Sequence, residues 1–188
     1  GIYSFIFFIF ILIFLILIDY INKMNELIKK EKYANKMYKK AIKDDLTGCF
    51  TYEYLKGKIN KEKSPYNLII IDLDDFKKIN DSLGHQIGDQ ILLKFVSITK
   101  NHLKSDEIFA RYGGDEFIIA TQNNDIDSRV ETISKIYKNL NIYDNSIDFS
   151  ISVGISKFNK YIPVKKAFKI TDSKLLEAKR KGKSKIIK

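Results

Sequence analysis

Hydrophobic residues along this chain fall into one long N-terminal run and several short runs further on. The long run extends from Ile2 to Ile18 and is almost entirely Ile, Phe and Leu, interrupted only by Tyr3 and Ser4. An uncharged run of this length approaches the roughly 20 residues that span the hydrocarbon core of a bilayer. A secretory signal peptide would have a basic residue before the run and small residues after it, and neither is present. We therefore predict a transmembrane helix within residues 1–20.

A lysine-rich segment without Pro or Gly follows at residues 21–43. Apolar residues recur in it at intervals of three and four, although Glu31 and Asn35 interrupt the series. This weak heptad pattern predicts a continuous signalling helix that pairs in parallel with a copy of itself; a single helix lying on the membrane surface is the alternative. Because the chain begins with Gly1 rather than Met, we also expect the chain to be a fragment, with residues 1–20 as the end of a longer N-terminal region.

The position of these lysines predicts the orientation of the chain. Lysine excess beside a span marks the cytoplasmic side, and the same cations are attracted to anionic lipid headgroups. The rest of the chain is therefore predicted to lie in the cytoplasm, attached to the inner membrane by the N-terminal span. The attraction of these lysines to the lipid bilayer explains much of the net charge of +10, so we expect no nucleic-acid partner.

The later hydrophobic runs predict one domain of mixed strands and helices, from about Asp44 to Lys188. Short continuous apolar runs favour strands, and spacing by threes and fours favours helices. Strands are expected near residues 67–72, 107–112, 116–121 and 149–155, and helices near 51–62, 87–102, 126–140 and 164–180. The single cysteine, Cys49, excludes an internal disulfide and is expected to be a small apolar residue that is buried or half-buried.

Three carboxylates follow the most hydrophobic of these strands. They are Asp72, Asp74 and Asp75. If the strand continues, Asp72 and Asp74 share one face of the sheet. Mg²⁺ prefers oxygen ligands and is usually held by one or two carboxylates together with substrate phosphates. From these residues alone, a metal site and a strand that runs out into solvent both remain open.

A second acidic pair lies at Asp115 and Glu116, directly after Gly113 and Gly114. Apolar runs on both sides predict a β-hairpin, because Gly accepts the positive φ angles that a tight turn needs. Bare glycine backbone beside two acids also suits a site for phosphate and metal. A solvated hairpin tip is the alternative.

Polar residues cluster between the two acidic motifs. They are Lys77, Asn80, Asp81, Gly84-His85 and Gly88-Asp89. Phe76 and Ile79 are expected to anchor a short helix, and Gly84 and Gly88 to flank a turn before the next helix. Asn and Asp side chains suit the edge of a nucleobase, since a carboxylate accepts from the N1 and N2 donors of guanine. With no second His or Cys nearby, a turn or hydrogen-bonding role is favoured for His85 over metal binding.

Taken in order, these motifs resemble the GGDEF domain of diguanylate cyclases. The matching segments are Asp44–Gly48, Ile71–Asp81, Gly84–Asp89, Arg111–Phe117, Ser152–Ile155 and Ala178–Lys183. The resemblance implies an α+β fold related to nucleotidyl cyclases and polymerase palms, an α/β sandwich with a mostly antiparallel central sheet flanked by helices. It also implies that two GTP molecules condense to cyclic di-GMP with loss of two pyrophosphates. Each domain holds half of the product, so the implied active form is a homodimer of facing domains.

The resemblance also implies roles for individual residues. Asp72, Asp115 and Glu116 would bind Mg²⁺ (or Mn²⁺) together with the Leu73 carbonyl, and Glu116 would assist the metal or deprotonate the attacking 3′-hydroxyl. Gly113 and Gly114 would lie against the GTP phosphates. The implied substrate-binding residues are Asn80 and Asp89 for guanine, Lys77, Lys179 and Lys183 for phosphate, and Phe76 and His85 in the same site.

Three departures from the family pattern are visible. Thr51-Tyr52 replaces an Asn-Arg pair, and Lys183 replaces an Arg, giving up a bidentate phosphate contact. The family's product-inhibition motif, Arg-x-x-Asp, is replaced by Lys104-Ser105-Asp106-Glu107. Because Lys cannot stack on guanine as Arg does, we expect feedback inhibition through this site to be weak or absent.

Two further functions remain open at this point. A catalytically silent GGDEF domain would bind GTP or cyclic di-GMP, or mediate dimerisation, without chemistry. The retained Asp72 and the Gly113–Glu116 motif favour the enzyme. A relative with relaxed base choice would make a mixed purine dinucleotide, although Asp89 argues for guanine.

Overall fold

The computed structural model describes residues 1–62, 65–122, 130–131, 140–142, 145–147, 150–159 and 161–188. It divides the chain into two compact units, Gly1–Ala41 and Ile42–Lys188. Each unit is considered by itself.

The N-terminal unit is a single helix. Helix α1 extends without interruption from Ile2 to Ile42, through a stretch that contains no Pro or Gly. Every large apolar side chain from Ile2 to Ile18 is exposed, so nothing in the described structure covers this hydrophobic surface. In the part of the chain that the structure describes, α1 is the one helix long and apolar enough to cross a membrane. The predicted continuous helix is confirmed, and its pairing with a second copy stays a prediction.

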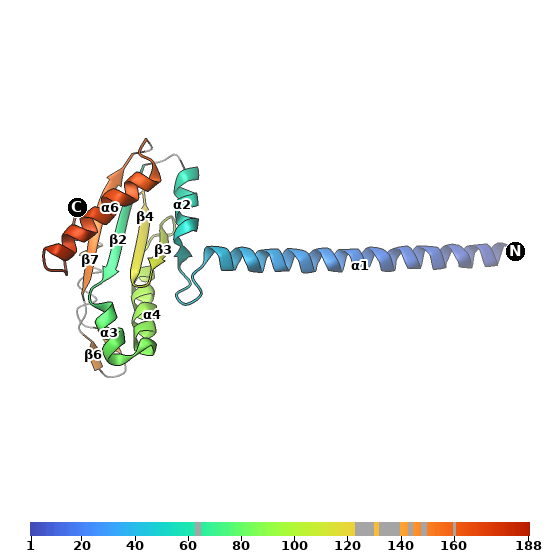
Figure 1. The fold of residues 1–188 in the computed structure, drawn as a ribbon. Coiled ribbons are helices and arrows are strands. Elements are labelled where there is room, and N and C mark those ends of the chain that lie inside the picture. Colours follow the sequence, from blue (N-terminus) through green and yellow to red (C-terminus); the bar gives the residue numbers. More distant parts are fainter. Residues whose placement is uncertain (63–64, 123–129, 132–139, 143–144, 148–149, 160) are drawn as a thin grey trace. The chain divides into compact units, whose positions relative to one another are not determined.

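The second unit is built on a mixed six-stranded sheet in the order β1-β3-β4-β2-β7-β8 (Figure 1). Its strands are β1 (Phe50–Thr51), β2 (Tyr66–Leu73), β3 (Ile108–Gly113), β4 (Glu116–Thr121), β7 (Ile151–Phe158) and β8 (Ile186–Ile187). The three central pairings are antiparallel, and the short outer strands β1 and β8 run parallel to their neighbours. A separate two-stranded sheet pairs β5 (Leu140–Ile142) with β6 (Asn145–Ile147). The predicted mostly antiparallel α+β sandwich is confirmed.

Helices cover both faces of the six-stranded sheet. Helices α2 (Tyr52–Lys61) and α6 (Val164–Arg180) lie on one face, and α3 (Phe76–Leu83) and α4 (His85–Asn101) on the other. Side chains along β2 alternate between two cores, with Leu68 and Ile70 beneath α2 and α6 and with Ile69 and Ile71 beneath α4. All eight residues of β2 are buried, as expected for a central strand covered on both sides.

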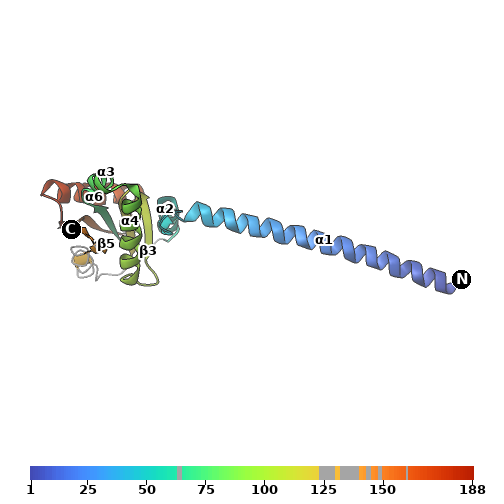
Figure 2. The same ribbon diagram turned by 90° about the horizontal axis from the view of Figure 1, so that it is seen from below.

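Two close contacts fix the helices on the sheet. Helix α6 crosses β7 and β2 (Figure 1), where a Cβ at Gly154 would lie 2.4 Å from the Thr171 carbonyl oxygen. Only glycine therefore lets α6 approach β7 this closely. Helix α4 runs beside β3 (Figure 2), and its Phe95 ring centroid lies 4.7 Å from that of Phe117 on β4.

The predicted strands and most helices are confirmed within a few residues. The helix expected near 126–140 falls largely outside the described residues. One expectation was wrong: Gly84 and Gly88 do not flank a turn. Gly84, with φ 87°, separates α3 from α4, whereas Gly88 is buried within α4, which begins at His85. Cys49 is buried as predicted, with 1% of its surface exposed.

Candidate active site

The two acidic motifs meet across the middle of the sheet. Asp72 near the end of β2 is the register partner of Glu116 at the start of β4. Directly opposed residues of an antiparallel pair point to the same face, so the two carboxylates share a surface. The Leu73 amide donates to the Asp115 carbonyl at 3.3 Å, which ties the end of β2 to the hairpin that connects β3 and β4. The fold thus brings Asp72, Leu73, Asp115 and Glu116 together.

This acidic surface is electrostatically unfavourable without a cation. Burial raises the pKa of Asp72 to about 6, and the charges of Asp115 and Glu116 add to the shift against the opposing effect of Lys179. The pKa of Glu116 is also raised, chiefly by burial and further by Asp115 and by Asp172 of α6. Lys179 Nζ lies 2.6 Å from Asp72 Oδ2 and supplies the nearest positive charge.

The donor set fits a metal that arrives with a nucleotide. Within the described ranges, no three His, Cys, Asp or Glu side chains form a ready-made metal cage. Mg²⁺ is commonly held by one or two carboxylates, a carbonyl and the phosphates of its substrate rather than by a protein cage. Asp72 and Glu116, with Lys179 standing in for a cation, match that arrangement. The assignment of Asp72, Leu73, Asp115 and Glu116 to Mg²⁺ stays a prediction.

The backbone conformation of the hairpin does not explain its two glycines. Neither Gly113 nor Gly114 has a positive φ, so the tight-turn argument was wrong. The strand pairing shifts register between Arg111 and Gly113, just before the short connection from Gly113 to Glu116. A Cβ at Gly114 would meet nothing within 4 Å, and one at Gly113 only Glu116 Oε2 at 3.8 Å. The bare backbone is therefore open to a ligand, which supports the predicted contact with phosphates.

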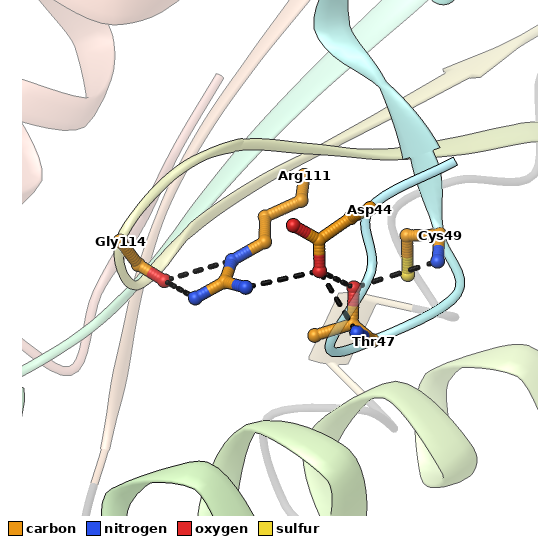
Figure 3. Close-up of polar contacts among 5 residues, drawn as sticks. All are labelled: Asp44, Thr47, Cys49, Arg111 and Gly114. Carbon is orange, nitrogen blue, oxygen red and sulfur yellow. Dashed lines mark hydrogen bonds and ion pairs between the residues drawn. The ribbon is translucent and has the colours of Figure 1, made fainter. Parts of the chain in front are cut away.

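Arg111 fixes this hairpin from below (Figure 3). Its Nε and Nη2 donate to the Gly114 carbonyl at 3.0 and 2.6 Å, and its Nη1 donates to Asp44 Oδ1 at 3.0 Å. The same Asp44 oxygen accepts from the amide and hydroxyl of Thr47, at 2.8 and 2.6 Å. Burial opposes ionisation of Asp44, but these donors outweigh it and hold its pKa below the usual value. Sequence reasoning missed this link, although both residues lie in motifs it singled out.

The residues predicted to read guanine lie at the junction of α3 and α4. Asn80 Oδ1 is buried and has no hydrogen-bond partner among the described residues. A Cβ at Gly88 would lie 1.8 Å from that oxygen and 3.2 Å from Phe76 Cζ, so Gly88 leaves the space that Asn80 occupies. Phe76 itself is a core residue with 8% exposed. His85, Asp89 and Lys77 are exposed on the same two helices.

Lys183 lies on the turn after α6. Its Nζ is 2.8 Å from Asp75 Oδ1. The pKa of Lys183 is raised, chiefly by that hydrogen bond, and the charges of Asp74 and Asp72 add to the effect. Lys183 therefore lies within electrostatic reach of the acidic surface, together with Lys179.

At the position of the family's product-inhibition motif, the Glu107 carboxylate is already hydrogen-bonded to other residues of the protein. Its two oxygens accept from the Thr121 hydroxyl at 2.7 Å and from the Lys104 amide at 2.9 Å, and only 9% of the residue is exposed. The carboxylate is thus committed to the fold. This arrangement agrees with weak feedback inhibition, which stays a prediction.

The Thr51-Tyr52 departure has a structural explanation. The Thr51 hydroxyl accepts from the Tyr54 amide and caps the start of α2. The Tyr52 ring makes edge contacts with Tyr112 and Phe168, at centroid distances of 4.8 and 4.9 Å. Tyr52 therefore connects α2, β3 and α6 by packing, where the family has an Arg.

Comparison with known proteins identifies related sequences. A sequence model described as "Diguanylate cyclase, GGDEF domain" matches residues 41–185. The diguanylate cyclase DosC of Escherichia coli is 35% identical over 133 residues, covering 68% of this chain and 29% of DosC. Diguanylate cyclase A of Treponema denticola is 30% identical over 139 residues, covering 71% of this chain and 38% of that protein. The chain spans about a third of the length of the curated relatives it matches.

Solved structures show the same fold. The coiled coil and GGDEF domain of DgcB from Caulobacter crescentus, determined in complex with c-di-GMP, superposes with a TM-score of 0.81 at 20% identity. The match covers 88% of this chain and 95% of that one.

Proposed function

This chain belongs to the GGDEF family, and from that premise we propose that it is a diguanylate cyclase that condenses two GTP molecules into cyclic di-GMP and two pyrophosphates. The observation that carries the proposal is the pairing of Asp72 with Glu116 across β2 and β4, beside the open backbone of Gly113 and Gly114. Two reciprocal steps make the ring: in each, the 3′-oxygen of one GTP bonds to the α-phosphorus of the other, the bond from that phosphorus to the leaving pyrophosphate breaks, and the hydroxyl proton is released.

The acidic residues serve the attacking and transferring groups. Mg²⁺ (or Mn²⁺), held by Asp72, Asp115, Glu116 and the Leu73 carbonyl, would neutralise charge on the triphosphate and polarise the α-phosphate. Glu116 either completes that ligand set or accepts the proton of the 3′-hydroxyl, and its raised pKa favours the second role. The amide groups at Gly113 and Gly114 are positioned to approach phosphate oxygens, because no side chain intervenes.

The lysines serve the leaving group. Pyrophosphate departs with additional negative charge, and fixed cations beside it lower the energy of the transition state. Lys179, now paired with Asp72, would exchange that carboxylate for phosphate when a nucleotide binds. Lys183 supplies a second cation from the following turn, and Lys77 a third from α3.

Asn80 and Asp89 would select guanine. A buried acceptor without a donor is energetically costly, so Asn80 Oδ1 favours a ligand that donates to it. The exocyclic amine of guanine is such a donor, and the Asp89 carboxylate can accept from guanine N1. Adenine has no N1 donor and no amine at C2, so the same pair disfavours ATP.

The domain organisation completes the proposal. Residues 1–20 would span the inner membrane, 21–43 would form a juxtamembrane signalling helix, and 44–188 would be the catalytic domain in the cytoplasm. Since each domain binds one GTP, the active form would be a homodimer with its catalytic domains facing one another. The helix would control how the two halves meet.

The test is product formation by the full chain in detergent micelles. Incubated with GTP and Mg²⁺, it is expected to form cyclic di-GMP, and Asp115→Asn is expected to abolish the product without unfolding the protein. Absence of product at high protein concentration, where dimers form, would favour the catalytically silent domain instead. Release of the chain from isolated membranes by alkaline carbonate would contradict the transmembrane assignment.

A further inference from the structure

Asp74 is a buried carboxylate to which neither the family resemblance nor the proposed chemistry gives a role. Only 4% of it is exposed, and both its oxygens are occupied. Oδ1 accepts from the Ser152 hydroxyl at 2.6 Å; Oδ2 accepts from the Ser150 hydroxyl at 2.5 Å and from the Ser184 amide at 2.9 Å. Its own amide donates to the Ser150 carbonyl at 2.9 Å. Asp74 therefore joins the end of β2, the start of β7 and the turn after α6.

The turn after α6 needs such an anchor. Lys183 and Ser184 are consecutive non-glycine residues with φ 59° and φ 50°, and Gly182 before them has φ 102°. Residues other than glycine rarely adopt this left-handed backbone conformation, and it persists only where surrounding contacts hold it in place. Asp74 holds the turn by its backbone at Ser184, and Asp75 holds it by the Lys183 side chain.

The anchored turn carries one of the cations proposed for the leaving group and directly follows the helix that carries the other. Lys179 lies in the last turn of α6 and reaches Asp72, and Lys183 follows four residues later, where it pairs with Asp75 and is affected by the charge of Asp72. Because Asp72 and Asp74 are two residues apart, one short segment bears both the acid proposed to bind metal and the anchor of the turn that carries Lys183.

We propose that Asp74 is a positioning residue that holds the C-terminal turn, so that Lys183 faces the acidic surface formed by Asp72, Asp115 and Glu116. Asp75 assists by pairing with Lys183 directly. The role rests on the proposed cyclase function. Asp74 touches neither metal nor nucleotide in this account; it acts through the turn.

A double-mutant cycle separates positioning from a general structural role. Asn at position 74 keeps the shape of Asp but removes its negative charge, so the two serine hydroxyls and the Ser184 amide lose a charged acceptor and their hydrogen bonds to it weaken. In the full chain, Asp74→Asn is expected to lower kcat/KM for GTP at least tenfold, mainly through KM. In a Lys183→Ala background the same change is expected to lower it less than twofold, because the turn no longer carries its cation.

Limited trypsin digestion gives a readout that does not depend on catalysis. The turn contains Lys181, Lys183 and Lys185, and cleavage there is expected to be faster in Asp74→Asn than in wild type. Asp75→Asn, at a more exposed site, is the second variant if Asp74→Asn does not fold, and it should show the same non-additivity with Lys183→Ala. Ser173→Ala, an exposed position on α6, is the control and should match wild type in both assays.

The outcomes distinguish the two claims. If the wild-type chain is active and Asp74→Asn has the same kcat/KM, the positioning role is overturned and the cyclase assignment remains intact. The same holds if the reductions in kcat/KM caused by Asp74→Asn and by Lys183→Ala multiply in the double variant. Unchanged trypsin cleavage would also overturn it. An inactive wild-type chain would instead overturn the proposed function, and the positioning role with it.

Discussion

The side-chain nitrogen of Lys179 on α6 lies 2.6 Å from Oδ2 of Asp72 on β2, although the two residues are 107 positions apart in the chain. The contact supplies charge to a buried acid whose pKa is raised to about 6 even with this partner in place. The folded protein therefore holds Asp72 in an environment that favours its neutral form, as expected of a site built to receive a cation.

Asp72→Asn is expected to abolish cyclic di-GMP formation and to stabilise the metal-free protein at neutral pH. Removing an ionised group whose pKa is raised by burial should gain on the order of 1–3 kcal/mol, or a few degrees in Tm. Thermal unfolding in EDTA at pH 7.5 measures this effect. Asp106→Asn, at an exposed position, is the control; a lower Tm for Asp72→Asn would contradict the electrostatic account.

The rate of product formation is expected to fall as pH is lowered through about 6, because a protonated Asp72 cannot bind metal. The folded pKa exceeds the ordinary value of 3.8, so this group lowers the stability of the metal-free protein as pH rises from about 4 to about 6. Raising Mg²⁺ should shift the rate midpoint to lower pH, since metal competes with protons. Initial rates between pH 5 and 8 at two Mg²⁺ concentrations measure the shift, and a midpoint independent of Mg²⁺ would argue against Asp72.

Arg111→Lys is expected to lower kcat about tenfold while the domain remains folded. Lysine cannot reproduce the two bonds to the Gly114 carbonyl together with the bond to Asp44, so the hairpin loses its fixed position. Asp44→Asn should have a similar but smaller effect. Steady-state kinetics and circular dichroism check both variants, with Asp45→Asn at the exposed neighbouring acid as control. Equal activity of Arg111→Lys and wild type would exclude a role for this link in catalysis.

Gly88→Ala is expected to raise KM for GTP severalfold or more, with a smaller change in kcat. The new Cβ would lie 1.8 Å from Asn80 Oδ1, and the amide would have to turn away from the base site. Gly57→Ala is a matched control, because a Cβ at this α2 position meets nothing within 4 Å and should stabilise the helix by about 0.5–1 kcal/mol. If both variants have the wild-type KM, Asn80 does not read the base.

Cyclic di-GMP is expected to bind weakly at Lys104 and Glu107. The Glu107 carboxylate is already bonded to Thr121 and to the Lys104 amide, and Lys cannot stack on guanine. Isothermal titration calorimetry of the full chain with cyclic di-GMP measures the affinity. Submicromolar binding that is lost in Lys104→Ala would refute the prediction.

Local sequence patterns predicted the elements of this fold but could not predict their register. The apolar run from Leu68 to Ile71 and the runs around Gly113 were sufficient to predict β2, β3 and β4. The pairing of Asp72 with Glu116 depends on how β2 and β4 align, which no local pattern specifies. Lys179 and Lys183 came into view only through the family resemblance.

The misjudged positions are those where the reason for a residue lies in a distant neighbour. Gly88 was predicted to be a turn residue. Its actual constraint is that a Cβ at this position would collide with Asn80, and this collision arises only once α3 packs on α4. The sequence left the role of Asp74 open, because its partners Ser150, Ser152 and Ser184 lie far from it in the chain. Arg111 and Asp44 are 67 residues apart, so their bond was equally invisible.

The absence of a positive φ at Gly113 and Gly114 bears on how such a domain changes over generations. Since neither φ requires glycine and a Cβ at Gly114 has free space, replacement there should leave the folded domain intact. Selection for a stable fold therefore does not protect this motif; only selection for the chemistry does. A lineage that ceased to need the product could lose its glycines by drift while keeping a domain able to bind a partner, without passing through an unfolded intermediate.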